Sequence, residues 1–361
     1  MSELRKLAII GRVPPPYGGV SVHLSRLLER LRRERIEYDF YDLAGKSIPE
    51  FNIYPAQSRL SWLLPFLICA RQKYGIIHLH TSNSNLVIAS DILLAGSGVR
   101  LVYTLHGEGI YRSATQTGSR ITRWLVRRAL RHAAHLFPIN KTVAQQLPTL
   151  GISPKHVTWM AAYLPPGSFE LRSAIVPENA RLFLSTHGPV IAMQGWFGAS
   201  INGRDTYGLD QIPILLNGLL PLFPNLGICL VMSGSLSNTH RDSIHALRME
   251  SKMDNHWLIL EDCGPAVLLY KQCDLFIRPT LSDGDSLSIR ECLSMGVPVV
   301  ASNAAPRPDG CVLYPVGNTN AIIDAIATRL TTSEVVIVTD DEYDHVAPLL
   351  DYYRKAWSKS S

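Results

Sequence analysis

The sequence lacks an apolar run of about 20 residues, so it predicts no membrane-spanning helix. Only a short apolar run precedes Arg12, which predicts a first strand and not a signal peptide. The six cysteines are scattered without a C-x-x-C pair, which argues against a structural zinc site and favours free thiols in a reducing compartment. The net charge of +5 suits phosphorylated ligands and anionic surfaces but is too small to argue for nucleic acid.

The chain of 361 residues is long enough for two α/β domains. Apolar strand-like runs alternate with polar or amphipathic segments, which predicts parallel sheets flanked by helices. These runs begin at residues 7, 76, 100 and 135, and again at 189, 227, 256, 273, 297 and 311. We expect doubly wound, Rossmann-like domains at 1–165 and 180–340, a proline-rich linker at 164–180, and a helix within 341–361 that packs across both domains.

Loops rich in glycine and in polar or ionisable residues follow several of the expected strands, at 11–20, 78–85, 105–109, 194–205 and 282–285. Two doubly wound domains place a ligand in a cleft at the carboxyl ends of their strands, which is where these loops fall. Their convergence favours an enzyme or a nucleotide-binding protein over a scaffold.

The most informative stretch is 277–302, which reads as strand, acidic loop, helix, glycine and apolar strand. Asp283 lies in the loop and Glu291 on the helix expected at 286–295, so both carboxylates can face one pocket. Main-chain N–H groups of residues 284–286 lie where a helix N-terminus attracts phosphate. Carboxylates that bind hydroxyls, beside a phosphate site, suit a nucleotide sugar. The alternative is a helix-cap carboxylate at Asp283 and a solvent-exposed helix residue at Glu291.

Other candidate residues also have a structural alternative. Gly18 and Gly19 suit a plain turn, but between a strand and a helix they favour close approach of the backbone to a ligand. His106 suits a strand-end histidine, although its place at the expected cleft favours the site. His78 and His80 alternate as metal ligands on a strand can, but no acidic cluster accompanies them, so we expect them to be structural and expect no metal site.

The chain resembles a retaining glycosyltransferase of the GT-B fold, in glycosyltransferase family four, of the type linked to bacterial surface polysaccharides. The family pattern is an acid and a glycine, a glutamate on the next helix, and then Gly-x-Pro-Val-Val. It is matched by these residues: Asp283, Gly284, Glu291, Gly296, Pro298, Val299 and Val300. Gly18, Gly19 and His106 also match family positions.

Three departures from the family pattern affect the donor site. Asp283 replaces the usual glutamate, and Asp285 with Ser286 replaces the usual Phe-Gly. The family's Arg and Lys that hold the donor diphosphate are missing; Trp196 and Tyr207 lie near their expected places. The candidate replacement cations are Arg204, Arg278, Arg290 and Arg307.

The resemblance implies transfer of a hexose from a UDP- or GDP-linked donor to a glycan or lipid-linked acceptor, with retention and with neither a metal nor a cofactor. It implies that Asp283 contacts donor-sugar hydroxyls, Glu291 the ribose hydroxyls and His106 the donor sugar. The expected donor-binding residues are Gly18, Gly19, Arg204, Arg278, Gly284, Asp285, Ser286, Leu287, Arg290 and Arg307. The alternatives are a nucleotide-sugar epimerase of similar fold, a glycan phosphorylase-like enzyme and a non-catalytic nucleotide-sugar-binding protein.

The segment 119–135 carries five arginines, at positions 120, 123, 127, 128 and 131. Its apolar residues, at 121, 125, 126, 129, 130 and 133, are expected to face the core. The segment predicts either an ordinary surface helix or a basic face that rests on anionic lipid. We expect a cytoplasmic protein, with peripheral contact at the inner face of the membrane as the second interpretation.

Overall fold

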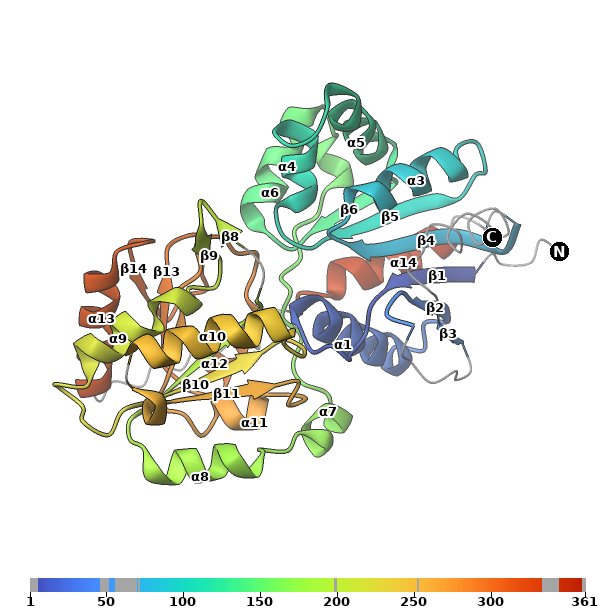
Figure 1. Ribbon diagram of the computed structural model, residues 1–361. Helices are drawn as coiled ribbons and strands as arrows, with labels where there is room; N and C mark the ends of the chain where they lie inside the picture. Colours follow the sequence, from blue (N-terminus) through green and yellow to red (C-terminus); the bar gives the residue numbers. More distant parts are fainter. Residues whose placement is uncertain are drawn as a thin grey trace. The chain divides into compact units, whose positions relative to one another are not determined.

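The computed structural model describes residues 6–45, 52–55, 70, 72–197, 200–251, 253–332 and 344–358. The chain divides into two compact units. The N-terminal unit comprises Met1–Pro14, Gly19–Leu164 and Asp344–Ser361, and the C-terminal unit comprises Pro15–Gly18 and Pro165–Tyr343. Each unit has a parallel sheet with helices packed against it (Figure 1). Within the described ranges, no helix has the length and apolar character needed to span a bilayer.

The N-terminal unit has a six-stranded parallel sheet in the order β3-β2-β1-β4-β5-β6. Its strands are β1 (Lys6–Gly11), β2 (Tyr38–Asp42), β3 (Ile53–Pro55), β4 (Tyr74–Thr81), β5 (Arg100–Leu105) and β6 (His135–Pro138). Its helices are α1 (Gly19–Arg33), α3 (Ser84–Leu94), α4 (Gly109–Thr115), α5 (Arg120–His132), α6 (Lys141–Gln146) and α14 (Ala347–Ser358), with 3-10 turns at Leu147–Leu150 and Pro154–His156.

Helices cover both faces of this sheet. α3, α4 and α5 pack on one face, and α1 with α14 on the other. α1 does so because Leu24, Leu27, Leu28 and Leu31 recur at helical spacing and form its buried stripe. α14 contributes its apolar residues to that same core, so it belongs to the N-terminal unit.

The C-terminal unit has a second six-stranded parallel sheet in the order β11-β10-β7-β12-β13-β14. Its strands are β7 (Val190–Gly195), β10 (Gly227–Met232), β11 (Trp257–Glu261), β12 (Leu275–Arg278), β13 (Val299–Ser302) and β14 (Cys311–Tyr314), with an antiparallel hairpin of β8 (Ser200–Ile201) and β9 (Arg204–Asp205). Its helices are α7 (Ser168–Ser173), α8 (Glu178–Thr186), α9 (Ile212–Leu219), α10 (Asn238–Ser251), α11 (Val267–Tyr270), α12 (Leu287–Ser294) and α13 (Thr319–Thr331), with 3-10 turns at Leu209–Gln211 and Asp254–His256.

Numbered within its own unit, each sheet has the strand order 3-2-1-4-5-6 of a doubly wound fold. The predicted pair of Rossmann-like sheets is therefore confirmed. The order reverses between β1 and β4 in one sheet and between β7 and β12 in the other. Ligands of such folds bind at the carboxyl edge beside this reversal, which identifies the edge to examine in each unit.

Every strand expected from sequence is present, but β2, β3 and the β8–β9 hairpin were not expected. β2 escapes the apolar pattern because it carries two buried acids, Asp39 and Asp42. Asp39 is paired with Lys73 at 2.6 Å, and Asp42 accepts a hydrogen bond from the main-chain N–H of Ala44 at 2.9 Å. These partners make buried charge tolerable in a strand whose sequence is polar.

Candidate active site

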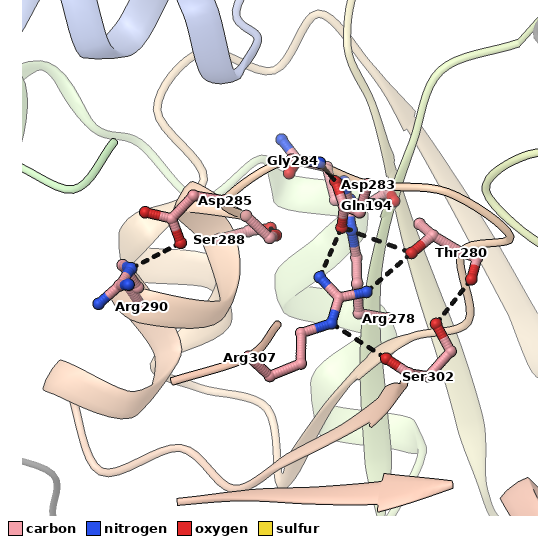
Figure 2. Close-up of polar contacts among 11 residues, drawn as sticks. Gln194, Arg278, Thr280, Asp283, Gly284, Asp285, Ser288, Arg290, Ser302 and Arg307 are labelled. Atoms are coloured by element: carbon pink, nitrogen blue, oxygen red, sulfur yellow. Dashed lines mark hydrogen bonds and ion pairs between the residues drawn. The ribbon is translucent and has the colours of Figure 1, made fainter. Parts of the chain in front are cut away.

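The candidate active site lies at the carboxyl edge of the C-terminal sheet, beside its reversal point. Arg278 and Ser302 end strands β12 and β13, and Gln194 is the last residue but one of the neighbouring β7. The parallel register places these three strand ends at one edge. Figure 2 shows them together with the loop that follows β12.

Arg278, Asp283 and Arg307 form a buried ion-pair cluster at this edge (Figure 2). Arg278 donates from Nε and Nη2 to the two carboxylate oxygens of Asp283, at 2.9 and 3.2 Å. Arg307 donates from Nη1 to Oδ2 of Asp283 at 2.7 Å. The three side chains are only 7, 11 and 1% exposed, in that order. Because two guanidiniums share one carboxylate, the cluster keeps an excess positive charge.

Main-chain and hydroxyl groups fix both guanidiniums (Figure 2). Arg278 donates from Nη1 to the carbonyl of Gln194 at 3.1 Å. Arg307 donates to the carbonyl of Ser302 at 3.0 Å and to the hydroxyl of Thr280 at 2.9 Å. The Ser302 hydroxyl donates in turn to the carbonyl of Thr280 at 2.6 Å. The two charges are thus held in place by the fold itself, as electrostatic preorganisation requires.

The cluster also sets the ionisation of its carboxyl group. Burial alone would raise the pKa of Asp283, but the Arg278 and Arg307 guanidiniums outweigh it and lower the pKa to about 2. Arg278 also lies over the ring of Tyr207, 5.1 Å from its centroid, in a cation–π contact. Asp283 is therefore ionised at neutral pH, and Tyr207 helps to hold Arg278.

Asp283 already has many hydrogen-bond donors. Besides the two arginines, its Oδ1 accepts from the main-chain N–H of Gly284 at 3.0 Å, and its Oδ2 accepts from the Thr280 hydroxyl at 3.4 Å. A carboxylate offers about four lone-pair positions, so little capacity remains for a sugar hydroxyl. Contact between Asp283 and the donor sugar stays a prediction, and it would require the exchange of one of these bonds.

The structure rejects the alternative interpretation of the two acids. Glu291 is only 6% exposed, so it is not a solvent-facing residue of α12. Ser286, and not Asp283, occupies the N-cap of α12. Leu287 begins the helix and is 7% exposed. Glu291 therefore lies inside the protein one helical turn beyond Leu287.

The entrance of α12 directly follows the acidic loop. Ser286 has extended backbone angles, but its side chain makes no capping hydrogen bond; its hydroxyl lies 3.2 Å from that of Ser288. Asp285 instead accepts from Nε of Arg290 at 2.8 Å, with both side chains nearly buried. The charge of Arg290 is thereby matched within the loop, which makes it a weaker candidate for a phosphate than the Arg278–Arg307 pair.

The remaining predicted donor-binding residues are Arg204, Gly18 and Gly19. Arg204 is on β9 and pairs with Asp210 at 3.5 Å. A side chain added to Gly18 would approach Ser233 at 3.9 Å, whereas one added to Gly19, at the start of α1, would enter open space. Backbone at Gly19 is therefore accessible to a ligand.

His106 follows β5 in the N-terminal unit and is 7% exposed. Its Nε2 lies 3.4 Å from Nδ1 of His80. Burial, and then the neighbouring histidines His23 and His78, lower the pKa of His106 well below its ordinary value, so its ring is neutral at physiological pH.

The sequence did not single out several residues at the carboxyl edges of the two sheets. They are Gln194, Tyr207, Thr280, Ser302 and His23. Most of them end a strand or follow one closely. The rule that parallel strands bring their carboxyl ends together could have identified Gln194, Thr280 and Ser302.

Known families match both halves of the chain. Residues 17–160 match a model described as Glycosyltransferase Family 4, and residues 207–332 match one described as Glycosyl transferases group 1. No curated protein sequence matches the chain.

Similar solved structures cover nearly the whole chain. Sucrose-phosphate synthase from Thermosynechococcus elongatus has a TM-score of 0.70 at 14% identity and covers 98% of this chain and 100% of its own. Anabaena Alr3699/HepE in complex with UDP-glucose has a TM-score of 0.69 at 15% identity, with 98% and 99% covered. UDP-GlcNAc 2-epimerase from Methanocaldococcus jannaschii, with UDP-GlcNAc and UDP, has a TM-score of 0.61 at 15% identity, with 96% and 99% covered. At these identities the likeness establishes the fold.

Proposed function

Because the chain is a GT-B glycosyltransferase, we propose that it moves a hexose from a nucleotide-sugar donor to a glycan or lipid-linked acceptor, with retention of configuration. The observation that carries the donor assignment is the cluster of Arg278 and Arg307 around one carboxylate. Its excess positive charge lies at the carboxyl edge of the C-terminal sheet, where doubly wound folds bind nucleotides. UDP and GDP are the proposed carriers, and the UDP complexes of the similar Anabaena protein favour UDP.

Arg278 and Arg307 could supply the positive charge that the missing Arg and Lys provide in the family pattern. We propose that the main-chain N–H groups at the start of α12 hold the donor diphosphate, and that the two buried guanidiniums attract it through their excess positive charge. Both guanidiniums are already oriented by hydrogen bonds, so they stabilise the leaving phosphate without reorganisation. Asp283 aligns them, and Glu291 binds the ribose hydroxyls.

The proposed reaction is a front-face substitution that needs no metal. The bond between the anomeric carbon and the donor phosphate oxygen breaks, and its electron pair stays with the phosphate. The acceptor hydroxyl oxygen bonds to the anomeric carbon from the same face, and its proton passes to the departing phosphate. Arg278 and Arg307 stabilise the charge that develops on that phosphate. We propose a role in bacterial surface-polysaccharide assembly, from the family resemblance.

A panel of UDP-, GDP-, ADP-, CMP- and dTDP-sugars, read by thermal shift, tests the donor assignment. A ligand at a hundred times its Kd stabilises the protein by roughly 2.7 kcal/mol. We expect one base to stabilise the chain and its sugar to be transferred only when an acceptor is added. Conversion of the donor sugar without an acceptor would identify an epimerase instead, and binding without turnover on any glycan or lipid-linked acceptor would favour a non-catalytic binding protein.

Helix α5 is the proposed membrane contact. Its buried residues are Val126, Ala129 and Leu130, but Ile121, expected in the core, is 70% exposed, and Trp124 is 61% exposed. Arg120 is exposed on the same stripe, one turn before Trp124. An exposed aromatic and an aliphatic side chain beside arginine suit the headgroup region of an anionic bilayer.

The arginines of α5 differ in whether their side chains already bind other groups of the protein. Arg123, Arg127 and Arg131 donate to the main-chain carbonyls of Gly118, Ala114 and Leu150, at 2.6 to 2.7 Å. Arg128 pairs with Asp91 at 3.0 Å. Arg120 and Trp124 are therefore sharper targets than the arginines that bridge to neighbouring loops.

We expect the protein to co-sediment with vesicles containing phosphatidylserine and to dissociate as salt rises, because each basic residue contributes about 1 kcal/mol near an anionic surface. The double variant Arg120→Gln with Trp124→Ala should lower the bound fraction several-fold, whereas Arg181→Gln, an exposed arginine of the other unit, should not. Equal binding by all three proteins would remove α5 as the contact.

A further inference from the structure

Three histidines from different elements meet inside the N-terminal unit. His23 comes from α1, His80 from β4 and His106 from the loop after β5, and they are 0, 3 and 7% exposed. One nitrogen of each ring lies within 4.8 Å of the other two. β1, which leads into α1, and β4 are the strands between which the sheet order reverses. The cluster thus lies at the ligand-binding edge of its sheet.

The tautomer of His23 follows from its partner. Its Nδ1 lies 2.6 Å from the carbonyl oxygen of Ala162. A carbonyl can only accept, so Nδ1 carries the proton and a neutral ring presents its lone pair at Nε2. A second-nitrogen hydrogen bond to a main-chain carbonyl is the usual way in which proteins orient a metal-binding histidine.

The spacing of His80 and His106 suits ligation. The 3.4 Å between Nδ1 of His80 and Nε2 of His106 is at the long limit of a hydrogen bond. It matches the separation of about 3.3 Å that tetrahedral geometry sets between two nitrogens bound to one zinc ion. The other nitrogen of His80, Nε2, is buried and finds no hydrogen-bond partner among the described residues. With Nδ1 bound to an ion, the proton of the neutral ring would lie on this Nε2.

The neighbouring His78 is a natural internal comparison. Its ring lies close to that of His80, but its Nδ1 contacts the Tyr353 hydroxyl and its Nε2 lies 2.9 Å from the Thr104 hydroxyl. Both nitrogens of His78 are therefore committed to structural hydrogen bonds. Sequence spacing pairs His80 with His78 on one strand, whereas the fold groups His80 with His23 and His106.

We propose that His23, His80 and His106 form a three-histidine site for a borderline divalent transition-metal ion, with Zn²⁺ as the first candidate. Imidazole nitrogen is a preferred ligand of zinc, and three protein ligands leave a fourth tetrahedral position for water. An ion would enter past His106, the most exposed of the three.

The ion would inhibit the enzyme, and this consequence rests on the proposed function. His106 is the residue expected to contact the donor sugar, and a metal-bound imidazole cannot do so. Turnover would therefore proceed without the ion and decline as the site fills.

Calorimetric titration of chelator-treated full-length protein with ZnCl₂ tests the site without any substrate. We expect one ion per chain for the wild type and for His156→Asn, which removes an exposed histidine of the same unit. In His23→Asn the amide can still donate to Ala162, but the Nε2 ligand is gone. Its zinc Kd should rise by more than about 100-fold, since even second-shell changes cost 10–100-fold. Equal zinc affinity in His23→Asn and wild type would overturn the proposal.

Co²⁺ provides a readout on the wild type that does not depend on a buried variant folding. We expect the intense visible absorption of tetrahedral Co²⁺ at one equivalent, lost on adding Zn²⁺ and absent in His106→Gln. A weak octahedral spectrum would contradict the site. In donor turnover assays, Zn²⁺ should inhibit wild type but spare His23→Asn; equal inhibition of both would refute the inhibitory role. A protein without turnover would refute the proposed function and leave the binding result to decide the metal site.

Discussion

Replacing Asp283 with asparagine should destabilise the C-terminal unit more than any other single change at the candidate active site. Asparagine leaves the Arg278 and Arg307 guanidiniums nearly buried without their shared counter-charge. Removing one partner of a buried ion pair costs about 3–5 kcal/mol. For a unit of this size that corresponds to a decrease in Tm of roughly 6–20 °C, measurable by calorimetry.

Two further variants separate this electrostatic effect from a general loss of packing. Asp324→Asn changes an exposed acid on α13 of the same unit, and it should alter stability by less than about 0.5 kcal/mol. Arg307→Met in the Asp283→Asn background removes one of the orphaned charges and should recover part of the loss. A cost below about 1 kcal/mol for Asp283→Asn would show that the two arginines do not depend on this carboxylate.

The same cluster predicts how stability depends on pH. The pKa of Asp283 is lowered to about 2 in the folded protein, against about 3.9 in an unfolded chain. Its contribution is therefore fully present above about pH 4 and is lost as the pH falls toward 2. The stability difference between wild type and Asp283→Asn should shrink over that window in urea titrations. Parallel curves would contradict the assignment.

The second large effect is expected on donor binding. Glu291→Ala should raise the Kd of the nucleotide sugar by roughly 10- to 150-fold, because a charged hydrogen bond contributes about 1.5–3 kcal/mol. Glu291→Gln keeps an acceptor of the same size and should lose less. This graded order is the signature of a ligand contact, and calorimetric titration with the donor measures it.

Two controls accompany the Glu291 series. Glu178→Gln, at a carboxylate that is 86% exposed on α8, should leave the donor Kd unchanged. Thermal unfolding of each variant shows whether the buried position tolerates the change. A donor Kd within twofold of wild type for a folded Glu291→Ala would remove Glu291 from the site.

The sheets could be predicted because parallel buried strands read as continuous apolar runs. The run that begins at residue 273 and the glycine after α12 placed that βαβ unit within a residue or two of its observed bounds. β2 could not be predicted, because its two acids are buried through partners distant in the sequence, such as Lys73. An apolar pattern reveals strands that are buried by the hydrophobic effect. It does not reveal strands whose buried acids are stabilised by ion pairs and hydrogen bonds.

The sequence could identify candidate residues by type and position, but it could not show which of them contact each other. Asp283 and Arg307 were both singled out from sequence, yet nothing local indicates that residues 24 positions apart share one ion pair. The histidine cluster is a stronger case, because His23 comes from a helix whose pattern shows only an apolar stripe. Contacts between strand ends and helices depend on sheet order, which the sequence leaves open.

Amide hydrogen exchange with and without saturating nucleotide tests whether the donor binds beside the Arg278–Asp283–Arg307 cluster, because it locates the donor on the unaltered protein. We expect slower exchange in residues 280–291, which contain the acidic loop and the start of α12, and around Arg307. Exchange in α8, which belongs to the same unit, should stay unchanged. Saturating nucleotide that leaves residues 280–291 unprotected, or protects only segments away from the Arg278–Asp283–Arg307 cluster, would contradict the account.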